Sequence, residues 1–188
     1  MGDPTPALRT LEVNVVPPDS VWATMYKREA RRLREVLIDL DLDVDVDVDI
    51  HHIGSTAIIG IFAKPTIDIQ NIDLLDTFND KMYMLEYEPK GEFGIAGRRY
   101  FRRNSPQGVR THQVHAFEAE SIGARRHLAF RDYMNSHAEA AEAYSLLKQK
   151  LAALYANDLQ AYMDGKDAFI KKHEALALAW LSHSRDNT

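Results

Sequence analysis

The sequence contains no cysteine, which excludes disulfide bonds and zinc sites built on thiolates. It also has no apolar run long enough to form a signal peptide or to cross a membrane. Basic residues number 23 and acidic residues 28, and the resulting net charge of -5 disfavours nonspecific binding to nucleic acid or to anionic membranes. We therefore expect a cytoplasmic protein whose partner is neither a membrane nor a nucleic acid.

Several motifs of nucleotide-binding and hydrolase sites are missing as well, namely a P-loop, a GxGxxG run and a G-x-S-x-G elbow. The 188 residues are 45% hydrophobic, which is enough to bury the core of one compact domain. We expect a single domain over residues 1–188, with a sheet-containing core at about 11–120 and a helical part at about 121–184.

The stretch HHIGSTAIIGIFAKPTIDIQNI, residues 51–72, predicts a strand, a Gly-Ser turn, a short helical segment and a second strand. Glycine lets the chain turn, and the backbone N-H groups at the start of the following helical segment can bind an anion. Phosphate is the anion we expect. The predicted phosphate-binding residues of this stretch are His52, Gly54, Ser55, Thr56 and Lys64.

Asp68 lies on the polar face of the second strand. With a period of two, Ile67 and Ile69 point to one side, whereas Asp68 and Gln70 point to the other. A carboxylate beside an amide oxygen can hold a hard cation such as magnesium or manganese. Alternatively, Asp68 only caps or hydrogen-bonds the preceding turn.

Four motifs in one order carry a resemblance to a known family. They are HIGSTA with AKPTIDI in the central stretch, RTHQVH at 110–115, HLAFRDYM at 127–134 and YMDGKDAFI at 162–170. Over nearly its whole length the sequence resembles the GrpB family, an uncharacterised group assigned to the nucleotidyltransferase superfamily. The resemblance implies an α+β fold with an α/β-like core, in which flanking helices cover a mixed sheet and the C-terminal part is helical.

The resemblance adds His115 and two arginines to the candidate site. Enzymes of this superfamily usually carry a third carboxylate on the strand beside the Asp-x-Asp strand, and His115 is the counterpart here. A histidine can bind a divalent ion or act as a base, although a lone strand histidine is as often part of a structural hydrogen bond. Arg110 and Arg131 are predicted to bind phosphate. Their alternatives are a solvated hairpin for Arg110 and a structural ion pair with Asp132 or Glu139 for Arg131.

The resemblance implies metal-dependent transfer of a nucleotidyl group from a nucleoside triphosphate to an unknown acceptor. The metal ligands would be Asp68, Gln70 and His115, with Mg²⁺ or Mn²⁺ as the cofactor. Gln70 stands where a second acid would be needed to grip two cations, which favours one metal over two. The alternative function is a noncatalytic module that binds a nucleotide or another phosphorylated small molecule.

Apolar spacing and turn residues predict the remaining elements. We expect an edge strand at 11–16, a helix after Ser20, a half-buried strand with alternating aspartates at 41–50, a helix at 74–88, a hairpin at 98–118, and helices after Ser121, at 138–155 and at 166–182. Asn157 and Gly165 are expected at helix ends.

Overall fold

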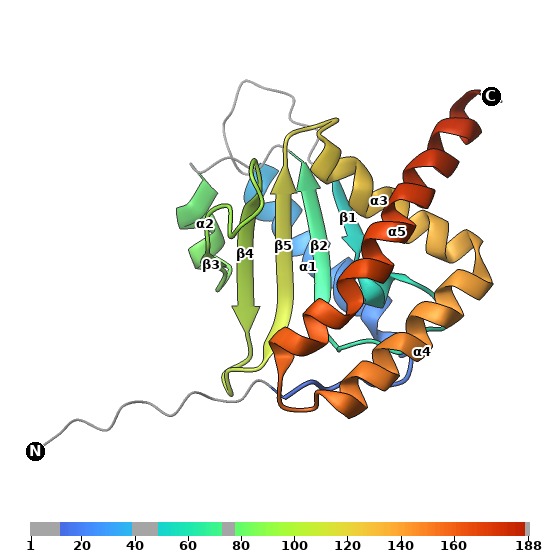
Figure 1. Cartoon of the computed structure of the whole chain (residues 1–188). Coiled ribbons are helices and arrows are strands. Elements are labelled where there is room, and N and C mark those ends of the chain that lie inside the picture. The colour runs from blue at the N-terminus through green and yellow to red at the C-terminus, as the bar shows by residue number, and fades with distance from the viewer. Residues whose placement is uncertain (1–11, 39–48, 73–77, 187–188) are drawn as a thin grey trace, which may run out of the picture.

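The structure, a computed structural model, describes residues 12–38, 49–72 and 78–186 and contains one mixed sheet (Figure 1). The described strands run in the order β1-β2-β5-β4-β3, and among them only β2 and β5 pair in parallel. Their bounds are Ile50–Ile53 for β1, Ile67–Ile72 for β2, Glu88–Pro89 for β3, Arg99–Asn104 for β4 and Arg110–Phe117 for β5. The predicted α+β architecture with a mixed sheet is confirmed.

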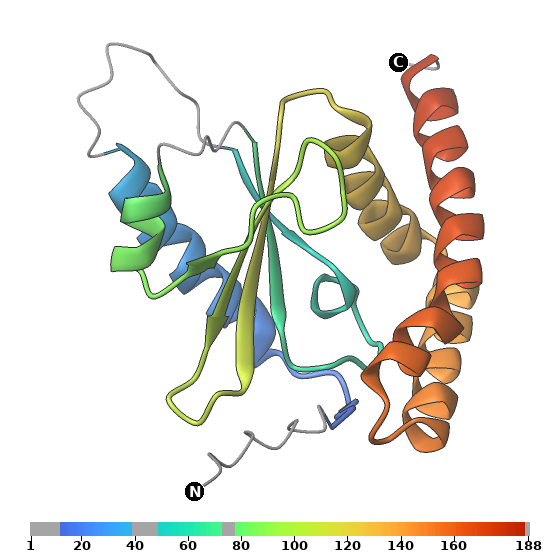
Figure 2. The ribbon, with the colours of Figure 1, turned by 60° about the vertical axis from the view of Figure 1, so that its left-hand side comes forward.

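Helices cover both faces of this sheet, as Figure 2 shows. One face carries α1 (Val21–Ile38) and α2 (Asn79–Met84). The other carries α3 (Ile122–Ser136), α4 (Ala138–Leu154) and α5 (Leu159–Asp186), so the C-terminal part is helical as predicted. Within the described ranges, no helix combines the length and the apolar character that crossing a bilayer requires.

The two faces of β2 carry different kinds of side chain. Ile67 and Ile69 are fully buried and join Trp22 and Leu33 of α1 in the larger hydrophobic core. Asp68 and Gln70 point to the face covered by α3 and α5, as the period of two predicts. The strand therefore has a packed hydrocarbon side and a polar side, and the polar side faces a cavity.

A buried ion pair ties α1 to the hairpin of β4 and β5. Arg103 donates to both carboxylate oxygens of Glu29 at 2.8 and 2.9 Å, and Tyr87 donates to the same carboxylate at 3.2 Å. Arg103 also contacts Nδ1 of His112 at 2.9 Å. Burial, followed by the nearby Arg103, lowers the pKa of His112 to about 4. His112 therefore belongs to the α1 face, opposite to His115.

Several predicted boundaries are wrong in detail. In place of the predicted edge strand at 11–16, the described part contains a single antiparallel bridge, between Val16 and Ala63. The helix at 74–88 is described only as α2, since Glu88–Pro89 pairs with β4 instead, and 74–77 lie outside the described residues. The alternating aspartates at 41–48 also lie outside them.

Gly165 does not end a helix. The helix α5 begins earlier, after Asp158, whose carboxylate accepts the backbone N-H of Ala161 at 3.0 Å and caps it. Gly165 lies inside α5, where a Cβ atom would stand 2.6 Å from a methyl carbon of Leu151. Glycine is therefore used here for the close approach of α5 to α4 and not for a turn.

Candidate functional site

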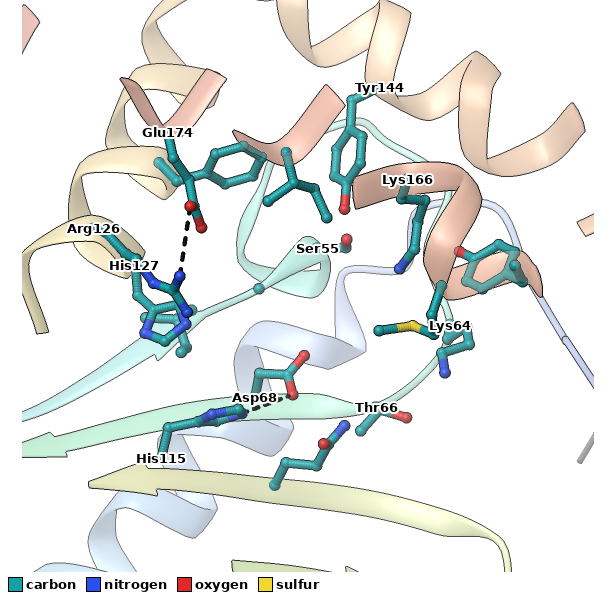
Figure 3. A pocket seen from close by; sticks show the side chains of 17 residues that line it. Ser55, Lys64, Thr66, Asp68, His115, Arg126, His127, Tyr144, Lys166 and Glu174 are labelled. Carbon is teal, nitrogen blue, oxygen red and sulfur yellow. Dashed lines mark ion pairs between the residues drawn. The ribbon is translucent and has the colours of Figure 1, made fainter. Parts of the chain in front are cut away.

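A cavity of about 340 Å³ lies between the polar face of the sheet and the helices α3, α4 and α5 (Figure 3). Asp68 stands in the middle of its floor. Lys64 and Lys166 lie at one end, and Arg126 with Glu174 at the other. The cavity thus offers a carboxylate between a lysine end and an end of mixed charge.

Gly54 and Asp68 are in contact at the centre of this cavity. Gly54 has φ 69° and ψ -171°, a conformation that is almost confined to glycine. A Cβ atom on Gly54 would lie 2.5 Å from Oδ2 of Asp68, so a larger residue would push the carboxylate away. The structure therefore brings the Gly-Ser turn and Asp68 together on one wall of the cavity.

The short helical segment after Gly54 is a single 3-10 turn, η1 (Ser55–Ala57). Three residues add too few peptide dipoles to attract an anion strongly. Ser55 lines the cavity and forms a hydrogen bond with the Tyr144 hydroxyl, whose pKa burial raises to about 12. Positive charge in the cavity must therefore come from side chains.

Two lysines supply that charge. The ammonium groups of Lys64 and Lys166 lie 5.9 and 4.5 Å from the centre of the Tyr162 ring. Burial, followed by the neighbouring Lys64, lowers the pKa of Lys166 to about 8. Burial also lowers the pKa of Lys64, although Asp68 counteracts this. An anion bound between the two lysines would relieve their mutual repulsion and hold both protons in place.

His115 lies beside Asp68, with its Nε2 atom 3.7 Å from Oδ1 of the carboxylate. The parallel register of β2 and β5 pairs Asp68 with Gln113 and Gln70 with His115, so all four side chains face the same side. Two ligands of one cation, each at about 2.1 Å, lie at most about 4.2 Å apart, so the separation alone would allow one ion to be shared by the two residues.

The opposite end of the cavity contains residues that the sequence did not point to. Arg126 on α3 and Glu174 on α5 form an ion pair at 3.6 Å, and His127 lies next to His115 with ring centres 5.5 Å apart. Burial raises the pKa of Glu174 and lowers that of His127. No local pattern could reveal this set, because α3 and α5 meet only through tertiary packing.

His52 and Thr56, both predicted to bind phosphate, do not line this cavity. The Thr56 hydroxyl donates to the Thr66 carbonyl at 3.1 Å and contacts Nε2 of His52 at 3.1 Å. The His52 ring stacks on Tyr26 of α1 at 4.7 Å, and burial lowers its pKa to about 4. These two side chains hold the turn in place, and a direct role in binding remains a prediction.

Arg131, Arg110 and Gln70 also lie outside the cavity lining. Arg131 donates to the His52 carbonyl at 2.9 Å and to Asp132 at 2.7 Å, which is the structural alternative considered from the sequence. Gln70 is fully buried and donates to the Ala124 carbonyl at 3.2 Å. Among the described residues no group of three His, Cys, Asp or Glu side chains could hold a metal, and the predicted metal site at Asp68, Gln70 and His115 remains a prediction.

Lys148 is a buried lysine behind the cavity, and we expect Lys148→Met to stabilise the fold. Its ammonium group has no hydrogen-bond partner among the described residues and lies 4.5 Å from the centre of the Tyr144 ring. Its pKa is lowered to about 7, first by burial and then by Lys166. Removing an unsatisfied buried polar group should raise the free energy of unfolding by about 1–3 kcal/mol in urea denaturation at pH 7.

The pH dependence gives a second readout for the same substitution. Folded Lys148 releases its proton near pH 7 and the unfolded lysine near 10.5, so the unfolded chain binds more protons between these values. The contribution of Lys148 to the free energy of unfolding therefore rises with pH between these two values, and this pH dependence should be missing in Lys148→Met. The exposed Lys150→Met on the same helix is the control. Equal stability of both variants would contradict the prediction.

Comparisons with known proteins assign the chain to a family. The family model described as GrpB protein matches residues 12–175. The UPF0157 protein YqkA of Bacillus subtilis is 38% identical over 90% of this chain, and the chain spans 48% of that relative's length. The glutamate-rich protein GrpB of Alkalihalophilus pseudofirmus is 30% identical over 85% of this chain and 92% of its own length. The crystal structure of the conserved protein GrpB from Enterococcus faecalis superposes with a TM-score of 0.79 at 34% identity, over 89% of this chain and 99% of that one. The chain therefore belongs to the GrpB family.

Proposed function

We propose that the cavity binds the phosphate groups of a nucleoside triphosphate and that the protein transfers the nucleotidyl group to a second molecule. The observation that supports this most is the contact between Gly54 and Asp68, which places a carboxylate within one small cavity with Lys64 and Lys166. The lysines would neutralise the β- and γ-phosphates. Asp68 would then hold the α-phosphate, at which the reaction takes place, through a divalent cation.

In this reaction an acceptor oxygen forms a bond to the α-phosphorus while the bond to the β-phosphate oxygen breaks. Pyrophosphate leaves with its negative charge facing the lysines, and the proton of the acceptor passes to water. A bound Mg²⁺ or Mn²⁺ would stabilise the charge that develops on the phosphoryl oxygens. Because the Asp68 carboxylate offers few ligand atoms, phosphate oxygens and water would have to complete the coordination shell of the ion.

Turnover can be tested directly with each nucleoside triphosphate and Mn²⁺, by following pyrophosphate release and the labelled product. We expect Asp68→Asn to lower the rate by a factor on the order of 100 or more, since it removes the charge that anchors the cation. Glu118→Gln is a matched control, because Glu118 is exposed and directly follows β5, the strand that pairs with β2. A rate that Asp68→Asn leaves unchanged would exclude this reaction.

The second candidate function is a module that binds a nucleotide or another phosphorylated small molecule without catalysis. The absence of a third metal-ligating side chain among the described residues at the site favours it. Thermal-shift measurements separate the two functions: stabilisation by a phosphorylated ligand that persists after chelation of divalent ions, without turnover, supports the binding module. Lys166→Met should abolish the shift in either case, whereas the exposed Lys172→Met on the same helix should keep it. A cytoplasmic location also remains a prediction.

A further inference from the structure

Arg98 is a buried arginine just outside the cavity, at the end of the loop that precedes β4. Its side chain is only 6% exposed, yet no ion pair in the described part of the chain includes it. Its Nε donates to the Glu92 carbonyl at 3.1 Å and its Nη2 to the Phe93 carbonyl at 2.7 Å. The guanidinium also lies 4.8 Å from the centre of the Tyr100 ring. Its position is therefore fixed by the loop and by β4.

The remaining arm of this guanidinium reaches the candidate site. Nη1 of Arg98 lies 3.4 Å from Nδ1 of His115. A guanidinium has donors only and keeps its proton at every pH at which proteins are folded. Nδ1 must therefore be the acceptor in this contact. In a neutral imidazole the proton then resides on the other nitrogen, Nε2.

The Nε2 atom of His115 is the one that faces Asp68, at 3.7 Å from Oδ1. With its proton on Nε2, the ring presents an N-H group to the carboxylate. A cation can bind only to a nitrogen without a proton. Coordination through Nε2 would move the proton to Nδ1, where it would point at the N-H groups of Arg98. The two roles of His115, metal ligand and donor to Asp68, exclude each other.

The geometry points to Arg98 as a positioning residue that holds His115 in the Nε2-H tautomer, so that His115 orients Asp68 and is not itself a metal ligand. Of Asp68 and His115, only Asp68 would then hold a cation. The tautomer follows from contacts within the protein alone, whereas its consequence for the cation rests on the proposed function.

Long-range proton-nitrogen correlation spectra of protein labelled with ¹⁵N-histidine distinguish the two tautomers of a neutral ring. The signal of His115 is identified as the one that is missing in the His115→Gln variant. We expect the Nε2-H pattern in the wild type and a mixture or the Nδ1-H pattern in Arg98→Met. Arg102→Met serves as the control, because Arg102 lies on the same face of β4 beside Gln113, but its guanidinium pairs with Glu88. An Nδ1-H pattern in the wild type, or an unchanged pattern in folded Arg98→Met, would overturn the proposal.

A second measurement requires no Arg98 variant. Binding of Mn²⁺ in the presence of pyrophosphate is followed by the electron paramagnetic resonance signal of the free ion. We expect Asp68→Asn to weaken the binding at least about tenfold and His115→Gln, which keeps an N-H donor, to change it less than threefold. Equal losses in both variants would overturn the proposal. If the wild type binds no Mn²⁺, the proposed function fails, and the spectra alone decide on Arg98.

Discussion

Replacing Glu29 by alanine is expected to destabilise the fold by about 3–5 kcal/mol, because the buried Arg103 would lose the partner of its charge. Glu29 is 1% exposed and accepts from both arms of that guanidinium. Tyr87 would also lose its hydrogen-bond acceptor, and no water could easily reach either group. Urea denaturation followed by circular dichroism gives the free energy of unfolding.

The control is Glu35→Ala, since Glu35 is an exposed residue of the same helix. It should change stability by less than about 0.5 kcal/mol. If Glu29→Ala does not fold, Glu29→Gln keeps the volume and one acceptor oxygen, and an intermediate loss is expected. A loss below about 1 kcal/mol for Glu29→Ala would show that solvent or a rearranged side chain compensates for Arg103.

Replacing Gly54 by alanine should have the largest effect on ligand binding. The backbone conformation at this position costs about 1–3 kcal/mol for a residue with a Cβ atom. In addition, that atom would lie 2.5 Å from Oδ2 and 2.9 Å from Cβ of Asp68. The carboxylate must move, so we expect both a loss of stability and the loss of the thermal shift by phosphorylated ligands.

The variant Gly60→Ala separates the effect of backbone strain from the effect of displacing the Asp68 carboxylate. Gly60 also has a positive φ, of 77°, but a Cβ atom there would meet nothing within 4 Å. It should therefore lose stability and keep ligand binding. Combining Gly54→Ala with Asp68→Ala removes two of the three contacting atoms, and the stability losses should then be less than additive. Fully additive losses would show that the two residues do not clash.

Local patterns predicted the parts of the fold that depend on neighbours in sequence. The alternation around Asp68 correctly separated the core face of β2 from the cavity face. A helix was predicted to begin after Ser121, and the Ser121 hydroxyl caps α3 by accepting the Ala124 N-H at 3.2 Å. The same period of two explains why His112 and His115 lie on opposite faces of β5. In each case the signal lies within a few residues.

The remaining parts of the site depend on contacts between distant segments. Lys166 and Glu174 lie two turns apart on α5, and only the packing of that helix over the sheet brings them to the two ends of one cavity. Arg98 is held in place by two carbonyl groups of a loop that folds around its guanidinium. Conversely, His52 stands within the most informative motif, yet its ring turns toward α1. Sequence spacing cannot show which side of a sheet a later helix will cover.

The position of α5 has a consequence for protein synthesis. This helix contributes groups to both ends of the cavity and is the last element of the described chain to leave the ribosome. A nascent chain that ends before α5 already contains all five strands and Asp68 but neither Lys166 nor Glu174. If the cavity binds phosphorylated ligands as proposed, a nascent chain should therefore gain this binding only after α5 has emerged.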